Sequence, residues 1–326
     1  MQTQDALNCL GIPAEVLAIL RCPVCRATLS LQEGGLVCRC CGHLFPLVNG
    51  IVRFVPAENY AGTFGFQWKR HARTQLDRDG SVESEIDFCE RTGFLPQEMA
   101  GKLVLDVGCG MGRFAEVASR WGAQVVAVDL SNAAEVANEN LSGRRSVTCF
   151  QADVFSLPLA PGTFDYIYSL GVLHHTPDCE KAFKVLPHLL KPGGTIAIWL
   201  YSGYNNWYRF SDIYRQFTRR LPVRWLHALC YIAVPMYYVH QGLRRLPLVG
   251  RPTSGLLHHA FPVSMHPDRE IRILDTFDWY SPKYQSKHTY EEVFRWFESC
   301  GLESLRVLQQ TVSVRGRRPL DRTETA

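Results

Sequence analysis

Three features are scarce or missing in this sequence: excess charge of one sign, long apolar runs and a secretion signal. The formal net charge is only +4, from 35 basic and 31 acidic residues among 326, which is too small for a chain built mainly to clamp nucleic acid. No apolar run reaches the roughly eighteen residues that a membrane-spanning helix needs. Residues 1–20 contain Asp5 and Glu15 and lack a basic start, so a secretory signal is not expected.

The twelve cysteines are unevenly distributed, and five of them fall between Cys22 and Cys41. Without a secretion signal, cysteines indicate a reducing compartment rather than a disulfide framework, so we expect a cytoplasmic protein. Hydrophobic residues make up 46% of the chain and charged residues 20%. That composition supplies a buried core and excludes a disordered or fibrous chain.

Four of these cysteines have the spacing of a zinc site. Cys22 and Cys25 form one C-x2-C pair, Cys38 and Cys41 form a second, and twelve residues separate the pairs. Two such pairs can place four thiolates tetrahedrally around one ion, and Gly42 permits the tight turn that follows. Four thiolates leave no open coordination position, so the predicted zinc ribbon holds a structural Zn2+ and not a catalytic one.

The segment between the two cysteine pairs predicts a hairpin with its turn at Glu33-Gly34-Gly35. Such a small module cannot fold on apolar burial alone, so metal binding would supply its folding energy. Cys40 is a spare thiol, and His43 could replace one of the ligands. A metal-free cysteine cluster is the alternative.

After residue 100, short apolar runs alternate with helical patterns, as in an α/β fold whose parallel sheet is covered on both faces. The expected strands are 103–107, 125–129, 147–151, 164–169 and 195–201, followed after a long insertion by 302–308 and 312–315. The expected helices are 112–121, 132–141, 178–190 and 289–300. The chain then divides into a metal module at 1–56, a connector at 57–100, an α/β core at 101–200 and 289–316, and a helical lid insertion at 201–288.

A glycine-rich turn, Val-Leu-Asp-Val-Gly-Cys-Gly-Met-Gly-Arg over 104–113, joins the first core strand to its helix. Such a turn lets the backbone approach a bound ligand closely. Asp129 ends the next strand, where a carboxylate can accept hydrogen bonds from both hydroxyls of a ribose. Dinucleotide-binding proteins share that acid, so these two features alone leave the ligand open.

The residues around the turn narrow the choice. Asp106 lies inside D-V-G-C-G-x-G, which resembles motif I of the class I S-adenosylmethionine methyltransferases rather than the dinucleotide pattern G-x-G-x-x-G. The core resembles that family in order, through Gln151-Ala-Asp153, Phe164–Ser169 and Leu190–Gly194. The resemblance implies a Rossmann-like fold with a seven-stranded, mostly parallel sheet, and S-adenosyl-L-methionine as the cofactor.

The resemblance also implies which residues contact the cofactor. Gly108 and Gly110 would shape the loop under the methionine portion, and Asp106 would orient its amino group. Asp129 would hold the ribose, and Asp153 the adenine amine. The full set implied in this way is Gln67, Trp68, Asp106, Gly108, Gly110, Gly112, Asp129, Leu130, Asp153, Val154 and Ser169.

Two further segments, Phe64–Trp68 and Leu274–Pro282, resemble a bacterial subgroup of these methyltransferases that carries an N-terminal zinc ribbon. The first segment lies in the connector, where such enzymes commonly fold a helix over the cofactor. This position is the reason to expect contacts from Gln67 and Trp68. Packing of the aromatic side chains against the core is the alternative.

Catalytic and acceptor-binding residues are less sharply marked. His174 and His175 lie among the residues after the fourth core strand, and in this family those residues face the methyl group. A histidine can take up a proton near neutral pH. A structural turn, with Asp178 capping the next helix, is the alternative. An insertion at this place usually borders the acceptor pocket, and its last part is aromatic and polar. The predicted acceptor contacts there are Asp278, Tyr280, Tyr284 and His288.

The insertion also bears on the kind of acceptor. Trp225–Val239 is largely apolar, is interrupted by Pro235 and is flanked by arginines. Such a segment is too short to span a membrane and is typical of an interfacial helix or of a packed lid. We therefore expect a small or lipid-like organic acceptor, such as a sugar, a polyketide-like or a quinone-like metabolite, and peripheral membrane contact through 201–250 as one of the two options.

Two other functions fit the same motifs. An RNA methyltransferase could use the ribbon to bind RNA, and a non-catalytic scaffold could bind the cofactor alone. The ribbon has only Arg26 and Arg39 between its first and last ligands and shows no aromatic stacking platform, which argues against RNA. The intact glycine turn argues against lost cofactor binding.

Overall fold

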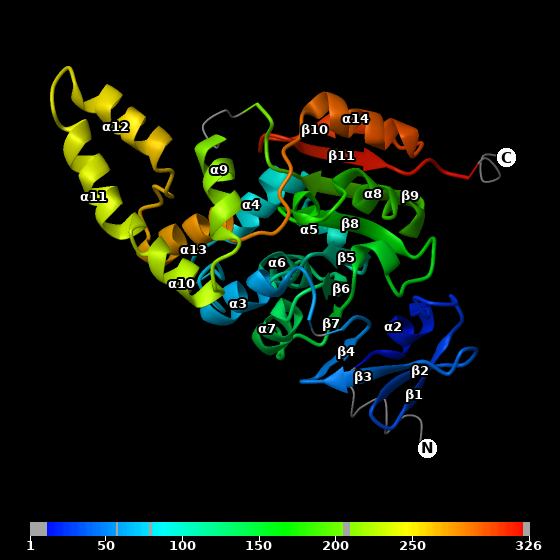
Figure 1. Ribbon diagram of the computed structural model, residues 1–326. Coiled ribbons are helices and arrows are strands. Elements are labelled where there is room, and N and C mark those ends of the chain that lie inside the picture. Colours follow the sequence, from blue (N-terminus) through cyan, green and yellow to red (C-terminus); the bar gives the residue numbers. More distant parts are fainter. Residues whose placement is uncertain (1–11, 57, 78–79, 205–208, 322–326) are drawn as a thin grey trace.

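The structure is a computed structural model that describes residues 12–56, 58–77, 80–204 and 209–321. Its centre is one sheet of eleven strands (Figure 1). The N-terminal module contributes β1 (Leu29–Gln32), β2 (Gly35–Cys38), β3 (Leu44–Val48) and β4 (Ile51–Arg53). The core contributes β5 (Leu103–Val107), β6 (Gln124–Asp129), β7 (Val147–Gln151), β8 (Phe164–Leu170), β9 (Leu190–Trp199), β10 (Glu303–Val307) and β11 (Ser313–Arg317).

Thirteen helices surround this sheet in the described part of the chain. Those before the insertion are α2 (Ala14–Ile19), α3 (Gly62–Arg70), α4 (Glu83–Thr92), α5 (Pro96–Met99), α6 (Arg113–Arg120), α7 (Ala133–Asn140) and α8 (Cys179–Lys184). The insertion holds α9 (Arg209–Thr218), α10 (Val223–Cys230), α11 (Ala233–Arg244), α12 (Gly250–Ala260) and α13 (Arg269–Tyr280), and α14 (Tyr290–Ser299) follows it.

The core strands lie in the order β7-β6-β5-β8-β9-β11-β10. Neighbours from β7 to β9 pair in parallel, whereas β11 pairs antiparallel with both β9 and β10. Among the core strands, β11 alone therefore runs against the rest. The predicted Rossmann-like, mostly parallel fold is confirmed, but the seven expected strands form only the core part of a sheet that has eleven.

Different helices cover the two faces of the core sheet. Successive residues of a strand point to opposite faces, so neighbouring strand residues pack against different helices. Leu105 and Val126 pack in one core with side chains of α8 and α14. Val104 and Val125 pack in a second core with side chains of α4, α6 and α7. Burial on both faces explains why these strands are apolar without alternation.

The N-terminal module extends the same sheet, which the sequence did not predict. β1 and β2 form the expected hairpin, and β4 pairs in parallel with β7, so that Val52 lies opposite Phe150. The Arg26 guanidinium adds hydrogen bonds to the carbonyl oxygens of Leu157 at 2.8 Å and Leu159 at 2.7 Å. The module is therefore attached to the core by backbone pairing and not only by a linker.

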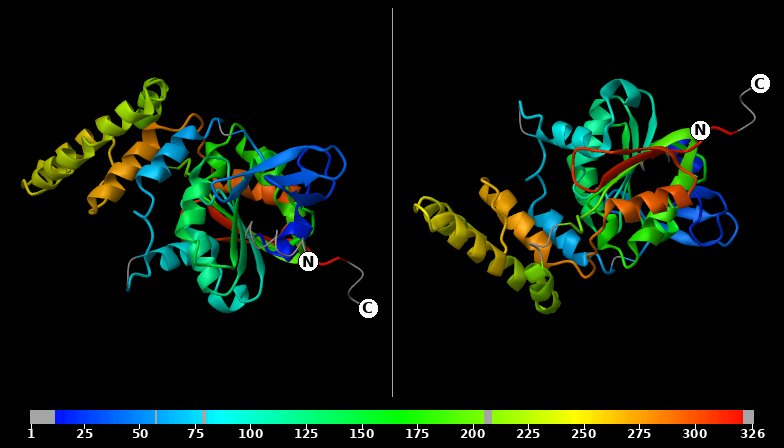
Figure 2. Two further views of the ribbon diagram at one scale, coloured as in Figure 1. Left: turned by 90° about the horizontal axis from the view of Figure 1, so that it is seen from below. Right: turned by 90° about the horizontal axis from the view of Figure 1, so that it is seen from above.

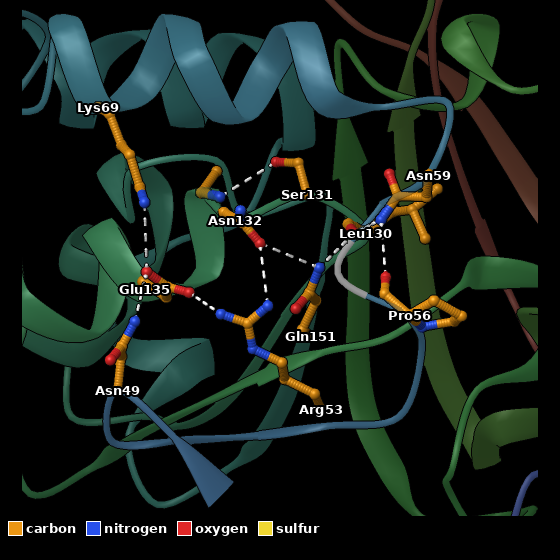
Figure 3. Close-up of polar contacts among 11 residues, drawn as sticks. Asn49, Arg53, Pro56, Asn59, Lys69, Leu130, Ser131, Asn132, Glu135 and Gln151 are labelled. Carbon is orange, nitrogen blue, oxygen red and sulfur yellow. Dashed lines mark hydrogen bonds and ion pairs between the residues drawn. The ribbon is translucent and has the colours of Figure 1, made fainter. Parts of the chain in front are cut away.

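A polar cluster beside this joint connects the module to α7 (Figure 3). Glu135 of α7, whose side chain is 7% exposed, forms an ion pair with Arg53 of β4. The same carboxylate accepts a hydrogen bond from Asn49 Nδ2 at 3.1 Å, and Lys69 Nζ lies 3.5 Å from it. Arg53 also donates to Asn132 Oδ1 at 3.3 Å.

The loop after β6 is held by the same cluster. The carbonyl oxygen of Leu130 accepts hydrogen bonds from Asn59 Nδ2 at 2.8 Å and from Gln151 Nε2 at 2.9 Å (Figure 3). The loop that follows Asp129 is therefore fixed from the connector on one side and from β7 on the other.

The insertion stands beside the sheet. Figures 1 and 2 show α11 and α12 as an arm that extends away from the core. At its base, α10 and α13 pack around Ile273 and Phe277, and Phe66 of α3 joins this small core. None of the described helices is long and apolar enough to cross a membrane.

Two local boundaries differ from the sequence-based expectation. The sequence predicted that Pro235 interrupts this segment, but the break lies earlier, between α10 and α11. Pro235 is in the first turn of α11, where a proline costs no hydrogen bond. The helix expected over 178–190 ends at Lys184, and a 3-10 turn that begins at Pro187 leads into β9 at Leu190. The strand is therefore longer at its start than predicted.

The buried ion pair predicts a defined stability change. Arg53→Met should lower the free energy of unfolding by roughly 3 kcal/mol, because it leaves the Glu135 carboxylate buried without its guanidinium partner. The double variant Arg53→Met/Glu135→Leu should regain most of that loss, since no charge is then left buried. Urea unfolding measures both, and equal losses in the two variants would contradict this role.

Candidate functional site

The four predicted cysteine ligands meet in one cluster. Their sulfur atoms all lie within 4.8 Å of one another, with 3.7 Å between the Sγ atoms of Cys22 and Cys41 and 3.3 Å between those of Cys25 and Cys38. Four sulfurs bound tetrahedrally to zinc at about 2.3 Å lie about 3.8 Å apart. The donor set and its spacing therefore fit a structural zinc ribbon.

The backbone of the second cysteine pair favours a thiolate. The N–H groups of Cys40 and Cys41 both donate to Cys38 Sγ at 3.4 Å, and these bonds lower the pKa of Cys38 to about 6. Gly42 turns the chain with a φ of +69°, as the spacing predicted. In the described residues, the cluster contains neither the Cys40 side chain nor His43, which packs against Phe45.

The second site is a pocket at the carboxyl ends of β5, β6 and β8. Residues of the connector form part of its wall, and four of them, Tyr60, Ala61, Phe64 and Trp68, are apolar or aromatic. Its lining consists of Tyr60, Ala61, Phe64, Trp68, Gln75, Val107–Met111, Arg113, Phe114, Val128–Leu130, Ala152, Val154, Leu170–Val172, His175, Thr176 and Asp278. Ligands bind at this edge in open parallel sheets.

The glycine turn has no room for side chains. A Cβ on Gly108, whose φ is +82°, would lie 2.3 Å from Cγ1 of Val172. A Cβ on Gly110 would lie 3.2 Å from the indole of Trp68, which covers the turn. Gly112 begins α6, and its Cβ would lie 2.8 Å from Leu141. The first two glycines therefore shape the pocket, and the third allows the helix to pack.

Asp129 links the turn to the end of β6. Its Oδ2 accepts a hydrogen bond from the Gly110 N–H at 3.0 Å, and its Oδ1 accepts from the Ser131 N–H at 2.8 Å and hydroxyl at 2.7 Å. Burial raises the pKa of Asp129, although these hydrogen bonds oppose the shift. The carboxylate lines the pocket and is held where ribose hydroxyls could reach it.

Asp106 is a buried acid next to the Tyr168 side chain, and one of its two oxygens lacks a partner. Its side chain is 3% exposed, and Oδ2 has no hydrogen-bond partner among the described residues. Burial raises the pKa of this carboxyl to about 8, and the charge of Asp129 adds to the shift. An amino group placed above it would supply the missing partner, which fits the role that the family resemblance implies.

The remaining predicted cofactor residues differ in position. Leu130, Val154 and Trp68 line the pocket. Asp153 accepts a hydrogen bond from the Phe155 N–H at 3.0 Å. Ser169 is buried below the pocket and donates to the carbonyl oxygen of Val107 at 2.9 Å. These contacts give Asp153 and Ser169 local structural partners, and their contact with a cofactor stays a prediction.

The two adjacent histidines have different surroundings. His174 is fully buried, and its ring stacks on Tyr201 with 3.9 Å between centroids. His175 lines the pocket, and its Nδ1 lies 3.1 Å from the carbonyl oxygen of Tyr284. A carbonyl only accepts, so Nδ1 donates there and Nε2 keeps a free lone pair. Burial lowers the pKa of both rings, which are therefore neutral at pH 7.

Gln67 and Asp278 meet at the border of the pocket, although 211 positions separate them. Gln67 Nε2 lies 3.4 Å from Asp278 Oδ1, and the Tyr201 hydroxyl donates to Asp278 Oδ2 at 2.5 Å. Gln67 is buried, and its Oε1 has no partner among the described residues. Of these three polar side chains, Asp278 lines the pocket and the other two hold it in place.

The other predicted acceptor residues lie elsewhere. Tyr284 and His288 line a neighbouring cavity of about 650 Å³, and His288 Nε2 is 2.7 Å from the Ser286 hydroxyl. Tyr280 faces the insertion, where its hydroxyl donates to the carbonyl oxygen of Pro262 at 2.6 Å. Of the four residues predicted to contact an acceptor, Asp278 is the one that lines the cofactor pocket.

Sequence reasoning missed two residues of this site. Tyr60 lines the pocket, and burial next to Asp153 raises the pKa of its phenol. Tyr201 follows β9 and binds Asp278. Tyr60 lies four residues before Phe64 in the connector. The aromatic segment from which a contact of Trp68 was predicted is therefore the signal that could also have indicated Tyr60.

The metal module yields a prediction with a matched control. Cys22→Ser should reduce bound zinc from one ion per chain to less than half, and should lower the unfolding temperature, because a three-thiolate site binds zinc less tightly. Cys40→Ser removes a thiol from the same module but outside the cluster. It should leave both quantities unchanged. Metal analysis and thermal unfolding measure these effects, and equal zinc loss in both variants would contradict the ligand assignment.

Asp106 yields a pH-dependent prediction. The folded chain keeps a proton on this carboxyl up to about pH 8, whereas the unfolded chain releases it near pH 4. Between these values the folded state binds more protons than the unfolded state, so the free energy of unfolding falls as the pH rises. In ligand-free protein, Asp106→Asn should therefore raise the free energy of unfolding at pH 8 by roughly 1–4 kcal/mol. At about pH 4.5 the two proteins should unfold alike. A gain of equal size at both pH values would exclude this ionisation as the cause.

Comparisons with known proteins agree with both sites. The family described as "Methyltransferase domain" matches residues 105–198, and the family described as "Trm112p-like protein" matches residues 14–50. A ubiquinone biosynthesis O-methyltransferase of Xanthomonas euvesicatoria is 39% identical over 104 residues, which cover 31% of this chain and 44% of that protein. The methyltransferase GfsG of Streptomyces halstedii is 38% identical over 104 residues, covering 30% and 37%.

A chloroplastic tocopherol O-methyltransferase of Arabidopsis thaliana is 33% identical over 135 residues, which cover 38% of this chain and 39% of that protein. The chain thus spans less than half the length of these curated relatives. Among solved structures, a putative S-adenosyl-L-methionine-dependent methyltransferase of Methanococcus maripaludis has a TM-score of 0.46 at 15% identity, over 83% of this chain and 99% of that one. By the two family matches, residues 105–198 are a methyltransferase domain, and a Trm112p-like zinc-ribbon module precedes it in the same chain.

Proposed function

We propose that this chain is an S-adenosylmethionine-dependent methyltransferase that acts on a small or lipid-like organic acceptor. The observation that carries the proposal is the pocket in which Gly108, Gly110 and Asp129 meet below Trp68. The glycine turn brings bare backbone to the pocket, so that a ligand could approach it closely, and the Asp129 carboxylate would accept hydrogen bonds from ribose hydroxyls. Asp106, buried next to Val107 of the pocket wall, has one oxygen without a partner among the described residues and would bind an amino group there.

Different residues in and beside the pocket would bind different parts of the cofactor. Asp106 would bind the amino group of the methionine portion, and Asp129 the ribose hydroxyls. Leu130 and Val154 would pack against the adenine, and Tyr60 would close the pocket from the connector. When bound, the cofactor supplies an activated methyl group on a sulfonium, and the protein supplies alignment and a site shielded from water.

His175 is the group best placed to take a proton from the acceptor. Its Nε2 carries a free lone pair because Nδ1 donates to Tyr284, and the ring lines the cofactor pocket. Burial keeps it unprotonated at neutral pH. Asp278 and Tyr201 lie nearby and would orient the hydroxyl or amine that is methylated. His174 supports this arrangement by packing on Tyr201.

The relatives bear on the class of acceptor. Those named for ubiquinone and tocopherol are O-methyltransferases, and both names refer to ring compounds with an apolar chain. An acceptor of this kind, quinone-like or otherwise lipid-like, would be held in a membrane. The proposal therefore extends to a cytoplasmic protein that contacts the membrane peripherally through the insertion at 201–250.

Charge and exposure in the insertion support this contact. Residues 211–261 contain seven arginines and no lysine against one acidic residue, Asp212. The same 51 residues hold 13 of the 21 large apolar side chains that are exposed in the described part of the chain. Trp225 is one of them, and it directly follows the exposed Arg224. Exposed apolar side chains among basic ones are typical of an interfacial surface.

The test of the reaction is methyl transfer from isotope-labelled cofactor into a lysate of the source cells, separated into lipid, RNA, protein and small-molecule fractions. Label in the lipid or small-molecule fraction is expected. Asp129→Ala should weaken cofactor binding by about 10- to 150-fold, because hydrogen bonds to a charged acceptor contribute about 1.5–3 kcal/mol. Label in RNA would support an RNA methyltransferase instead, and cofactor binding without any label would support a scaffold.

His175 is tested in the same assay. His175→Ala should lower kcat by roughly 10²- to 10⁴-fold, because a general base in the transition state is lost. Cofactor affinity should change less than about twofold, since the residue reaches the acceptor side of the pocket. A variant with unchanged kcat would remove the proposed base.

Membrane contact is tested by flotation with vesicles. The full chain should bind phosphatidylglycerol vesicles at low salt and bind phosphatidylcholine vesicles much more weakly. The variant Arg219→Ser/Arg220→Ser should bind roughly 30-fold more weakly, at about 1 kcal/mol per arginine near an anionic surface. Arg145→Ser/Arg306→Ser, which removes the same charge from exposed positions outside the insertion, should bind like the original chain. Equal loss in both variants would indicate that only net charge matters.

A further inference from the structure

A second cavity lies beside the cofactor pocket, between the start of α8 and the segment that leads into α14. Its volume is about 650 Å³, which is in the range of small-molecule binding sites. Among the described residues, Thr176 alone lines both cavities. The proposed methyl transfer uses none of the charged side chains that line this second cavity, which are Asp178, Glu180, Glu292 and Arg295. The cavity is therefore a candidate for a separate site.

One wall of this cavity holds a serine and a histidine in contact. Ser286 and His288 both line it. Ser286 Oγ lies 2.7 Å from His288 Nε2, closer than its other partner, the carbonyl oxygen of His174, at 3.3 Å. The His288 N–H donates to the carbonyl oxygen of Tyr201 at 2.9 Å, and the ring of Trp296 packs on the imidazole with 4.9 Å between centroids. The hydroxyl and the imidazole are therefore held together at the cavity surface.

A carboxylate lies at the other nitrogen of the imidazole. Glu292 Oε2 is 3.4 Å from His288 Nδ1, and the same oxygen accepts a hydrogen bond at 3.0 Å from the Thr289 N–H as part of the cap of α14. A carboxylate accepts and does not donate, so Nδ1 carries the ring proton and Nε2 offers its lone pair to the Ser286 hydroxyl. The contact of Glu292 with Nδ1 is longer than a full hydrogen bond, as is common in catalytic sites before substrate binds. The three groups thus stand in the order of nucleophile, base and orienting acid.

Protonation at this site favours the serine as the nucleophile. Burial lowers the pKa of His288, and Glu292 opposes the shift, so the imidazole is neutral at pH 7 and can take the proton of the Ser286 hydroxyl. Cys179 lies next to Ser286 and is 5% exposed. Burial raises the pKa of its thiol, so the sulfur stays protonated and unreactive. The serine is therefore the group that this site can activate.

We propose that Ser286, His288 and Glu292 form a hydrolytic triad, and that this second cavity binds and cleaves a small carboxylic ester. Ser286 and His288 are its catalytic residues, and Glu292 is a positioning residue that orients the imidazole. Arg295 lines the same cavity with an exposed side chain. It supplies a positive charge for the carbonyl oxygen of the ester, which becomes negative when the serine attacks. This activity is separate from methyl transfer and does not depend on it.

The reaction needs only the ester and water. His288 Nε2 takes the hydroxyl proton as Ser286 Oγ forms a bond to the carbonyl carbon. The bond from that carbon to the alcohol oxygen then breaks, and the leaving alcohol takes the proton from His288. In the second half, His288 takes a proton from water, the water oxygen attacks the acyl group, and the bond to Ser286 breaks as the serine regains its proton. One ester and one water give one acid and one alcohol.

The first test is covalent labelling of the full chain with an alkyl fluorophosphonate, whose fluoride an activated serine displaces from phosphorus. Peptide mass spectrometry should find the label on Ser286, and Ser286→Ala should stay unlabelled. Ser299 is a matched control, because it lines the same cavity but its hydroxyl donates to the carbonyl oxygen of Trp296 at 2.9 Å. Ser299→Ala should react like the original chain, and cofactor affinity shows that each variant is folded. Label at another residue, or equal label in Ser286→Ala, would overturn the proposal.

The second test is hydrolysis of p-nitrophenyl acetate. Ser286→Ala and His288→Ala should each lower kcat by roughly 10²- to 10⁴-fold, whereas Ser299→Ala should keep it. Glu292→Gln should lower kcat and also move the acid limb of the pH–rate profile to lower pH, because Glu292 raises the pKa of His288. A residue that only caps α14 would not move that limb. If the original chain hydrolyses the ester no faster than Ser286→Ala, the proposal is overturned, whatever the outcome for methyl transfer.

Discussion

The carboxylate of Glu135 is buried, and the groups that neutralise it determine how the metal module meets the cofactor side of the sheet. Burying a carboxylate is costly unless a cation and hydrogen bonds replace its water. Arg53 can do so only because β4 pairs in register with β7. Asn49 and Lys69 complete the set from the module and from α3. Strand pairing, the ion pair and the loop that follows Asp129 are therefore mutually dependent.

The local features of this chain could be predicted, because spacing along the chain fixes them. The cysteine pairs, the core strands and the glycine turn each depend on residues that are close in sequence. The contact between Tyr201 and Asp278 and the pairing of Val52 with Phe150 join residues far apart. No period in the sequence encodes such contacts. They follow from how whole elements pack, and this is why the sequence named segments that border the pocket but not the contacts that join them.

Residues that are close in sequence have different surroundings in the structure, for simple geometric reasons. His174 and His175 are equivalent in sequence, but the chain turns after β8 so that one ring stacks on Tyr201 and the other reaches the pocket. On α13, Asp278 and Tyr280 point to opposite sides because two helical steps amount to about 200°. A sequence motif can name the segment that borders a site, whereas the backbone conformation selects which of its side chains enter.

The continuation of the sheet into the N-terminal module also determines where the sheet ends. At one side the sheet ends in β10, which carries Glu303 and Arg306, and charges of this kind discourage pairing with other chains. At the other side of the core, β7 contains the apolar Val147 and Phe150, and β4 pairs with its last two residues. If the metal were lost and the module unfolded, β7 would become an exposed apolar edge. The zinc-ribbon module thus shields this edge of the core against self-association as well as against unfolding, and metal starvation would leave the core more prone to aggregate.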